Sequence, residues 1–135
     1  MKSKIVLLFT ILIVANGCAT SKISSNLLNQ KGIIKLILLY PNGEGKTFNW
    51  DYYTNKHYPL LKKYFGESLK ALALDKGESS GIPNIPVPYV AIAYLYFENV
   101  EAFQDVMKRN GTEIMADIPK YTNISPVVQI SKVVQ

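Results

Sequence analysis

The chain has 135 residues, of which 48% are apolar, and it carries 15 basic side chains, 10 acidic side chains and a single cysteine, Cys18. This length suits one domain, and the apolar content is sufficient for a buried core. Because the lysines are scattered and form no basic stripe interleaved with aromatic residues, the composition argues against nucleic-acid binding.

The first 18 residues have the layout of a signal peptide. Lys2 and Lys4 precede an uncharged apolar run over residues 5–15. As a helix this run would be about 16 Å long, which is too short to cross a hydrocarbon core of ~30 Å. We therefore predict export rather than a membrane-spanning helix.

The apolar run ends in Ala15-Asn16-Gly17 followed by Cys18. A small residue before a cysteine at this place resembles the lipobox of bacterial lipoproteins, although Asn16 departs from the usual small or apolar residue. We predict that Cys18 is lipidated and anchors the protein to a bacterial membrane, on the periplasmic side or at the cell surface. Ordinary signal cleavage is the alternative. Lipidation of Cys18 would leave the folded domain without a thiol.

A polar segment, residues 19–31, follows the leader and is predicted to be a tether. The folded domain is predicted to span residues 32–135. It opens with a β-branched and leucine-rich run, residues 33–40, which predicts a strand that ends at the turn beginning with Pro41.

Residues 47–65 are predicted to form an amphipathic helix. Thr47 or Asn49 can cap its start, and Gly66 can end it. Apolar and aromatic side chains recur at helical spacing in this segment, at Trp50, Tyr53, His57, Leu60, Leu61 and Tyr64.

Two further strands are predicted after this helix. Residues 68–77 alternate in a strand pattern, although their leucines and alanines also suit a helix. Residues 78–88 contain three prolines and are predicted to be a loop. Residues 89–97 form a continuous aromatic and β-branched run, which predicts a third strand.

A second helix is predicted over residues 99–118, with Asn99 as its cap and a possible interruption at Asn110-Gly111. Residues 125–134 predict the last strand. The order βαββαβ is that of an α+β, ferredoxin-like fold, in which both helices cover one face of an antiparallel sheet.

The first and third strands are apolar on both faces, although two helices can cover only one face. In the first strand Ile34, Leu36, Leu38 and Tyr40 alternate with Ile33, Ile37 and Leu39, and only Lys35 is polar. A second apolar sheet face is too large a patch to leave in water. We therefore predict a symmetric homodimer in which two sheets close into a barrel.

His57 is the sole histidine of the chain and the leading candidate for a catalytic residue. It lies four residues after Tyr53 and seven before Tyr64, so the three side chains are expected near one helix face. Pro59 is expected to kink the helix or to begin a new segment there. The ordinary pKa of histidine suits proton transfer at neutral pH. A histidine hydrogen-bonded only for packing remains the alternative.

Tyrosines are the candidate partners of His57, because they can donate a hydrogen bond to a carbonyl oxygen while forming an aromatic wall. With nine tyrosines in the chain, core packing is the alternative role for each. The predicted substrate-binding residues are Leu38, Tyr40, Tyr53, Tyr64 and Tyr94.

Two other chemistries are not supported by the motifs. The segment from Tyr40 to Thr47 ends in Gly-Lys-Thr, but a phosphate-binding loop needs glycine where Tyr40 stands, and Pro41 removes a backbone amide. The carboxylates show no metal-ligand spacing, although Asp51 and Asp117 could approach in space. We predict neither a metal nor a cofactor.

Three segments together resemble the EthD-like family of the dimeric α+β barrel superfamily. They are "IKLILLYPNGEGKTFNWDYYTNKHYPL", "PYVAIAYLYFENVEAFQ" and "IMADIPKYTNISPVVQIS", and the resemblance extends from Ile33 to Val134. It implies a dimer with a small-molecule cleft between the helices and the sheet of each subunit.

The resemblance also implies candidate activities. Relatives include proteins tied to oxidative ether breakdown and, more distantly, small cofactor-free enzymes acting on lactones, quinones and polycyclic aromatics. Members are often labelled reductases, although this sequence shows no nicotinamide or flavin fingerprint. We predict a hydrophobic small-molecule cleft near His57, used either by a cofactor-free or reductase-associated enzyme or by a noncatalytic ligand-binding dimer. A structural dimer is a third possibility.

Overall fold

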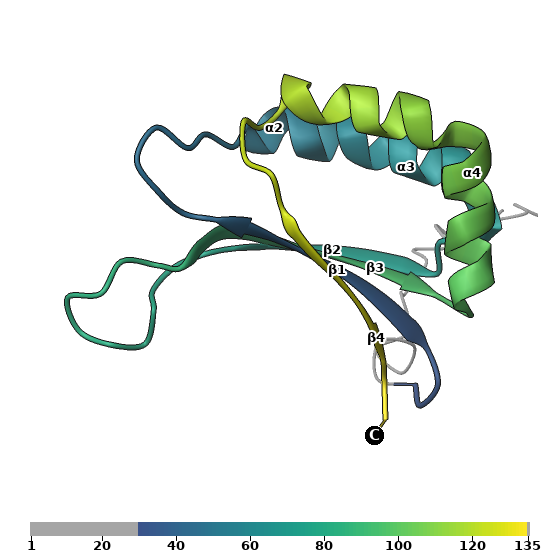
Figure 1. Ribbon diagram of the computed structural model, residues 1–135, viewed down its shortest axis with the longest axis horizontal. Helices are drawn as coiled ribbons and strands as arrows, with labels where there is room; N and C mark the ends of the chain where they lie inside the picture. Colours follow the sequence, from purple (N-terminus) through teal and green to yellow (C-terminus); the bar gives the residue numbers. More distant parts are fainter. Residues whose placement is uncertain (1–29, 135) are drawn as a thin grey trace, which may run out of the picture.

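The computed structural model describes residues 30–134, in which a four-stranded antiparallel sheet carries all the helices on one face (Figure 1). The sheet order is β2-β3-β1-β4. The strands are β1 (Ile34–Pro41), β2 (Ala71–Lys76), β3 (Tyr89–Phe97) and β4 (Val127–Lys132). The predicted ferredoxin-like βαββαβ fold is confirmed. The predicted signal peptide, Cys18 and all but the last residues of the predicted tether lie outside the described residues.

The register of the sheet decides which side chains face the helices. Leu36 of β1 pairs with Leu95 of β3 on one side and with Ile130 of β4 on the other. Because partners in register point to the same face and neighbours along a strand alternate, these residues share the helix-covered face. Leu72 of β2 pairs with Leu95 and joins them.

The predicted first helix is composed of four short segments. They are α2 (Trp50–Tyr52), a π-helical turn η1 (Tyr53–His57), α3 (Tyr58–Phe65) and a 3₁₀ turn η2 (Gly66–Ser68). Asn49 caps the start, since its Oδ1 accepts a hydrogen bond from the Tyr52 amide at 3.0 Å. Gly66 ends α3 with a φ of 51°, which favours glycine.

Pro59 explains why the segment changes type where it does. Proline has no amide hydrogen and is tolerated in the first turn of a helix. Pro59 lies in the first turn of α3, directly after the π-helical turn, which the Tyr58 amide closes by donating to the Tyr53 carbonyl. Of the two expected effects, the structure shows a new segment. The wider turn includes both Tyr53 and His57.

The second long helix, α4 (Val100–Asp117), continues through Asn110 and Gly111 into a 3₁₀ turn, η3 (Ile118–Lys120). The interruption considered at Asn110-Gly111 does not occur, since burial of Val106 and Ile114 on either side of it favours one continuous helix over the weak propensity of glycine. Asn99 caps α4 by accepting from the Ala102 amide at 2.8 Å. Within residues 30–134 no helix combines the length and hydropathy needed to cross a membrane.

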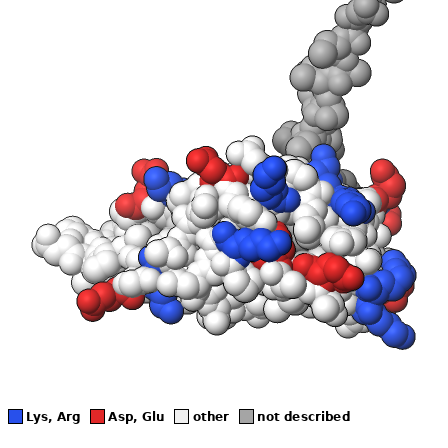
Figure 2. Space-filling view, turned by 90° about the horizontal axis from the view of Figure 1, so that it is seen from above, with Lys and Arg blue, Asp and Glu red and all other residues white. Residues whose placement is uncertain are grey.

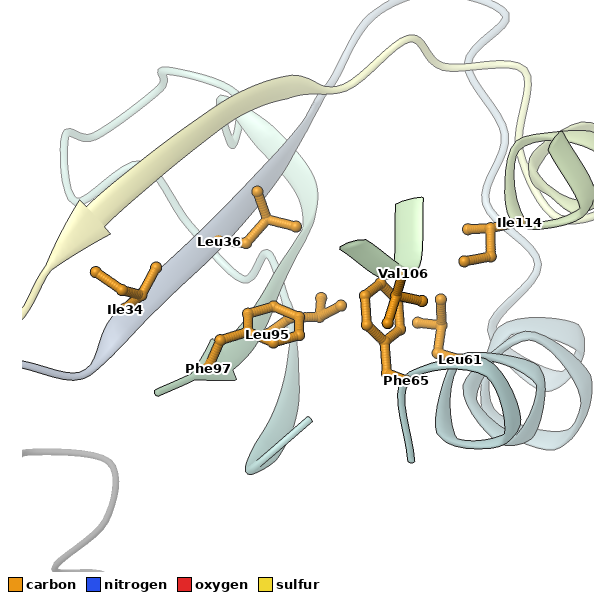
Figure 3. Packing of buried hydrophobic residues seen from close by; sticks show 8 residues of the cluster. All are labelled: Ile34, Leu36, Leu61, Phe65, Leu95, Phe97, Val106 and Ile114. Atoms are coloured by element: carbon orange, nitrogen blue, oxygen red, sulfur yellow. The ribbon is translucent and has the colours of Figure 1, made fainter. Parts of the chain in front are cut away.

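The main core lies between α3, α4 and the sheet. Figure 3 shows its buried members, which are Ile34, Leu36, Leu61, Phe65, Leu95, Phe97, Val106 and Ile114. Phe97 is fully buried and packs against Phe65 with ring centroids 5.2 Å apart. This core holds the helices at a fixed distance above the sheet.

The outer face of the sheet, opposite the helices, is also largely apolar. Ile37 and Tyr94 pair there across β1 and β3, and Lys35 lies over the rings of Tyr94 and Tyr96. At one edge of the sheet, Val127 and Val128 of β4 point to opposite faces, and each is more than half exposed. The helices therefore leave both the outer face and the β4 edge uncovered.

The helical face has mixed charge. Figure 2 looks onto this face and shows basic and acidic side chains interspersed among uncharged ones. A surface on which both signs alternate produces no strong field of one sign.

Candidate functional site

An apolar cavity of about 200 Å³ lies between the sheet and the helices, beside the main core. Its lining residues are Leu36, Leu38, Tyr40, Tyr53, His57, Leu61, Phe65, Leu95, Phe103, Met107, Ile114, Met115, Ile118, Tyr121 and Val128. Met115 of α4 and Val128 of β4 are 57% and 54% exposed. The cavity therefore opens between α4 and the uncovered β4 edge.

The polar side chains of the lining are one imidazole and three tyrosines. His57 and Tyr53 come from the π-helical turn, Tyr40 comes from the end of β1, and Tyr121 follows η3. The ring of His57 lies 4.6 Å from that of Tyr121 and 5.1 Å from that of Tyr53, measured between centroids. Three segments distant in sequence thus bring their polar groups to one part of an apolar cavity.

His57 is held by a buried carboxylate. Its Nδ1 lies 2.9 Å from Oδ2 of Asp117, and the two side chains are only 5% and 4% exposed. The other carboxylate oxygen, Oδ1, accepts a hydrogen bond from the Tyr52 hydroxyl at 2.9 Å and lies 3.1 Å from Lys120 Nζ. Asp117 therefore has three donors, two of which lie on the solvent side of the pair.

Burial and hydrogen bonding act in opposite directions on the protonation of this pair. Burial lowers the pKa of His57 below its ordinary value of 6.5, and the hydrogen bond and charge of Asp117 offset this only in part. Burial alone would raise the pKa of Asp117, but hydrogen bonds from His57, Tyr52 and Lys120 outweigh it and lower that pKa. At neutral pH the pair is a neutral imidazole beside a carboxylate.

These protonation states define the tautomer of His57. An ionised carboxylate can only accept hydrogen bonds, so Nδ1 of the neutral ring must carry the proton that it donates to Asp117. Nε2 is then left as an unprotonated nitrogen, available to a molecule in the cavity that His57 lines. This arrangement suits a general base.

The tyrosines provide neutral hydrogen-bond donors beside this base. The hydroxyls of Tyr40 and Tyr121 lie 3.0 Å apart. Burial raises the pKa of Tyr40, Tyr53 and Tyr121, so all three stay protonated at neutral pH. In a pair of hydroxyls one donates to the other, and the accepting hydroxyl keeps its own hydrogen for a ligand.

The structure brings together four of the six predicted catalytic and substrate-binding residues. His57, Tyr53, Tyr40 and Leu38 all line the cavity. Tyr53 and Tyr40 are also fully buried.

The other two predicted residues lie elsewhere. Tyr94 points to the outer face of the sheet, because it pairs with Ile37 while its neighbours Ala93 and Leu95 face the helices. Tyr64 packs against the main core but is not part of the cavity lining. Neither Tyr94 nor Tyr64 therefore lines the cavity with His57.

The sequence prediction did not assign Asp117 or Tyr121 to the site, and it considered Asp117 only as a carboxylate that could approach Asp51. Asp117 stands in the last turn of α4, where the helix dipole disfavours a negative charge, and that turn contains no basic residue. An acidic residue at that end of a helix is a usable sign of a specific partner. Tyr121 carried no comparable signal, since its place beside His57 depends on the turn after α4.

Metal ligation has no support in the described part of the chain, residues 30–134, where no group of three histidine, cysteine or carboxylate side chains comes together. Asp117 is paired with His57 and Lys120, while Asp51 lies in the first turn of α2. A negative charge at a helix start is favourable without any ligand.

Comparison with known proteins agrees with this architecture. The fold is that of a ferredoxin-like α+β domain, and residues 43–125 match the EthD domain. An EthD-like protein from Ralstonia eutropha JMP134 is 35% identical, with a TM-score of 0.73, and the match covers 78% of this chain and 95% of that one. This chain belongs to the EthD domain family.

More distant structures share the fold. An ethyl tert-butyl ether D (EthD) family protein from Bacillus halodurans C-125 is 22% identical with a TM-score of 0.50, covering 74% of this chain and 97% of that one. A hypothetical Arabidopsis thaliana protein is also 22% identical with a TM-score of 0.50, covering 80% and 94%. No curated protein sequence matches the chain significantly.

The buried pair predicts a loss of stability in acid in two pH windows. The lowered pKa of His57 means that the unfolded chain binds a proton below pH 6.5 while the folded chain resists it, so stability falls as the pH drops below 6.5. The lowered pKa of Asp117 adds stability that is present above its ordinary value of 3.8 and is lost as the pH falls through its folded pKa.

Urea unfolding from pH 8 to pH 3 measures both effects. We expect the midpoint to be level above about pH 7 and to decline in the first window, and His57→Gln to remove that decline. Asp117→Asn should reduce the second decline. An equal decline between pH 7 and pH 5 in the wild type and in His57→Gln would contradict the assignment.

Proposed function

We propose that this protein binds a small, hydrophobic, carbonyl-bearing or cyclic molecule in the cavity and that His57 acts on it as a general acid and base. One observation carries the proposal: Nδ1 of a buried His57 lies 2.9 Å from the Asp117 carboxylate at the wall of an apolar cavity. A buried charge is costly unless it is paired and hydrogen-bonded, and histidine-carboxylate pairs in cavities are candidates for proton transfer.

The chemistry that this geometry supports is proton transfer next to a carbonyl. Nε2 of His57 would take a proton from the carbon beside the carbonyl while a hydroxyl of the Tyr40-Tyr121 pair donates to the carbonyl oxygen. The resulting imidazolium is stabilised by Asp117, and the proton can return to another atom of the substrate. Proton transfer of this kind needs no electron donor or acceptor.

The cavity also limits the ligand. Its volume of about 200 Å³ is below the range of about 300–1,000 Å³ typical of sites for drug-sized ligands, which favours a single ring or a short chain. The lining contains no lysine or arginine, so a buried anionic group would have no cationic partner there. A neutral ligand fits this lining best.

We also propose that the protein is a homodimer joined through the outer face of the sheet. Apolar residues such as Ile37, Ile92 and Tyr94 occupy this face, and the helices leave it uncovered. A stable interface buries about 800 Å² per partner, which a four-stranded sheet face can supply. The position of Tyr94 supports an interface role rather than a role in the cavity.

We also propose that the protein is exported and anchored by a lipid on Cys18. The signal-peptide layout and the lipobox-like residues before Cys18 support this proposal. The protein would then act at a bacterial membrane surface without a spanning helix.

Ligand binding is predicted to stabilise the protein against heat. We expect at least one member of a library of quinones, lactones, aromatic acids and ethers to raise the melting temperature, since a ligand that prefers the native state stabilises it. Met115→Trp, at the cavity mouth, should abolish the rise, while Ile82→Trp, on an exposed loop, should retain it. No stabilisation of the wild type by any compound would favour a structural dimer.

Turnover of the stabilising compound then separates enzyme from binder. We expect His57→Ala to lower the rate by about 10²–10⁴-fold, the usual contribution of a general base, while Tyr64→Phe leaves the rate unchanged. Binding without any product in the wild type would contradict catalysis and favour the noncatalytic ligand-binding dimer.

The dimer is tested by mass in dilute solution. We expect light scattering to give twice the chain mass, and Ile92→Glu on the outer face to give a monomer, because an unpaired charge there would be buried. Gln104→Glu on the exposed side of α4 is the matched control and should remain dimeric. A monomeric wild type would refute the proposal.

Lipidation is tested by metabolic labelling in a bacterial host. We expect a labelled fatty acid to enter the protein and Cys18→Ser to lose both the label and the membrane association. A wild-type protein that is cleaved without acquiring the label would favour ordinary signal cleavage.

A further inference from the structure

We propose that Tyr52 and Lys120 are positioning residues, which hold Asp117 as an anion against Nδ1 of His57 and thereby keep the proton of the neutral ring on Nδ1 and off Nε2. This inference rests on the proposed function for its catalytic meaning. It concerns two side chains outside the cavity lining, and both act only through Asp117.

The two carboxylate oxygens of Asp117 have different partners. Oδ2 faces His57 Nδ1 at 2.9 Å, whereas Oδ1 accepts from the Tyr52 hydroxyl at 2.9 Å and meets Lys120 Nζ at 3.1 Å. Tyr52 belongs to α2, Asp117 ends α4, and Lys120 closes η3. Residues of α2 and η3 thus meet the carboxylate at the end of α4. That carboxylate is almost fully buried, whereas the Lys120 side chain is 60% exposed.

Asp117 needs these donors because its location disfavours a charge. It is buried and stands at the C-terminal end of α4, and both circumstances favour the protonated carboxyl. A protonated Asp117 could donate to Nδ1 of His57, and the ring would then carry its own proton on Nε2. That tautomer presents a donor to the cavity in place of a base. Tyr52 and Lys120 therefore select the basic tautomer by stabilising the anion.

The remaining titratable groups around the pair do not compete with this control. Tyr40 approaches from β1, Tyr53 from η1 and Tyr121 from the segment after η3, and burial raises the pKa of each. They remain uncharged over the range in which His57 titrates. Among the groups that face the pair, Lys120 is thus the cation and Tyr52 the hydroxyl donor to Asp117.

This division also explains two adjacent tyrosines in the sequence. The Tyr53 ring lines the cavity 5.1 Å from the His57 ring. Tyr52 points away from the cavity and reaches Asp117 from outside. Consecutive residues of a helix point in different directions, so Tyr53 contacts the His57 side of the His57-Asp117 dyad and Tyr52 contacts the Asp117 side.

Nuclear magnetic resonance of the sole histidine tests the proposal without any substrate. In the full-length chain labelled with ¹⁵N at histidine, the ring nitrogen shifts identify the tautomer, and their pH dependence gives the titration midpoint. We expect the wild type to show a protonated Nδ1 and an unprotonated Nε2 at pH 7.5.

Tyr52→Phe and Lys120→Met are expected to move these signals. With one donor fewer, Asp117 is more readily protonated and can donate to Nδ1, which shifts the ring toward the Nε2-protonated tautomer. This shift supports the proposal, and the double variant should show the larger one. Tyr64→Phe and Lys62→Met, which contact neither residue of the dyad, should match the wild type.

An unchanged tautomer in both single variants, with or without a raised midpoint, would show that Asp117 stays an anion without Tyr52 and Lys120 and would overturn the proposal. The Lys120→Met variant changes an exposed side chain, so it remains informative if Tyr52→Phe fails to fold. If the histidine signals change as expected in the variants but the protein binds no compound, the proposed function fails and the positioning roles stand. The failure of the proposed function and the failure of the positioning roles can therefore be told apart.

Discussion

The hydrogen bond between His57 and Asp117 is the interaction on which the site depends. It joins the π-helical turn to the end of α4 across 60 positions of sequence, at a place where both side chains are nearly removed from water. Removing Asp117 would leave Nδ1 of the buried His57 without its partner, and removing His57 would leave Oδ2 of Asp117 without one, which is the costly case for such pairs. The pair therefore both ties the two helical segments together and places an imidazole in the cavity.

The one-sided coverage of the sheet determines where the chemistry can lie. Both faces are apolar, yet α3 and α4 cover only one of them (Figure 1). The covered face carries the buried side chains of the main core (Figure 3). Since side chains alternate along a strand, each strand contributes one set to the cavity side and the other to the proposed dimer interface.

Much of the fold was predictable because its signals are local. The cap at Asn49, the stop at Gly66 and the β-branched runs of β1 and β3 act within a few residues of themselves. The strand over residues 71–76 was confirmed despite its ambiguous composition. The possible interruption at Gly111 did not materialise, because packing of α4 on the sheet overrides a weak local propensity.

The helical spacing and the strand end were enough to indicate which polar residues line the cavity, as for His57, Tyr53 and Tyr40. Tyr94 and Tyr64 are tyrosines of the same chemical type, but the sheet register and the helix rotation place them elsewhere. Asp117 and Tyr121 reach His57 only after α4 has packed and its terminal turn has formed. No local sequence pattern shows that Asp117 and Tyr121 will lie next to His57.

The sequence by itself thus determined the order of elements, the apolar character of both sheet faces and the presence of a single titratable imidazole near a proline. Only the tertiary structure decided that Asp117 accepts from His57, that Tyr52 and Lys120 support it, and that Tyr94 lies on the far face. The physical reason is the range of the interactions. Propensities, caps and periodicity act between neighbours in the chain, whereas a buried hydrogen bond depends on how separate elements pack.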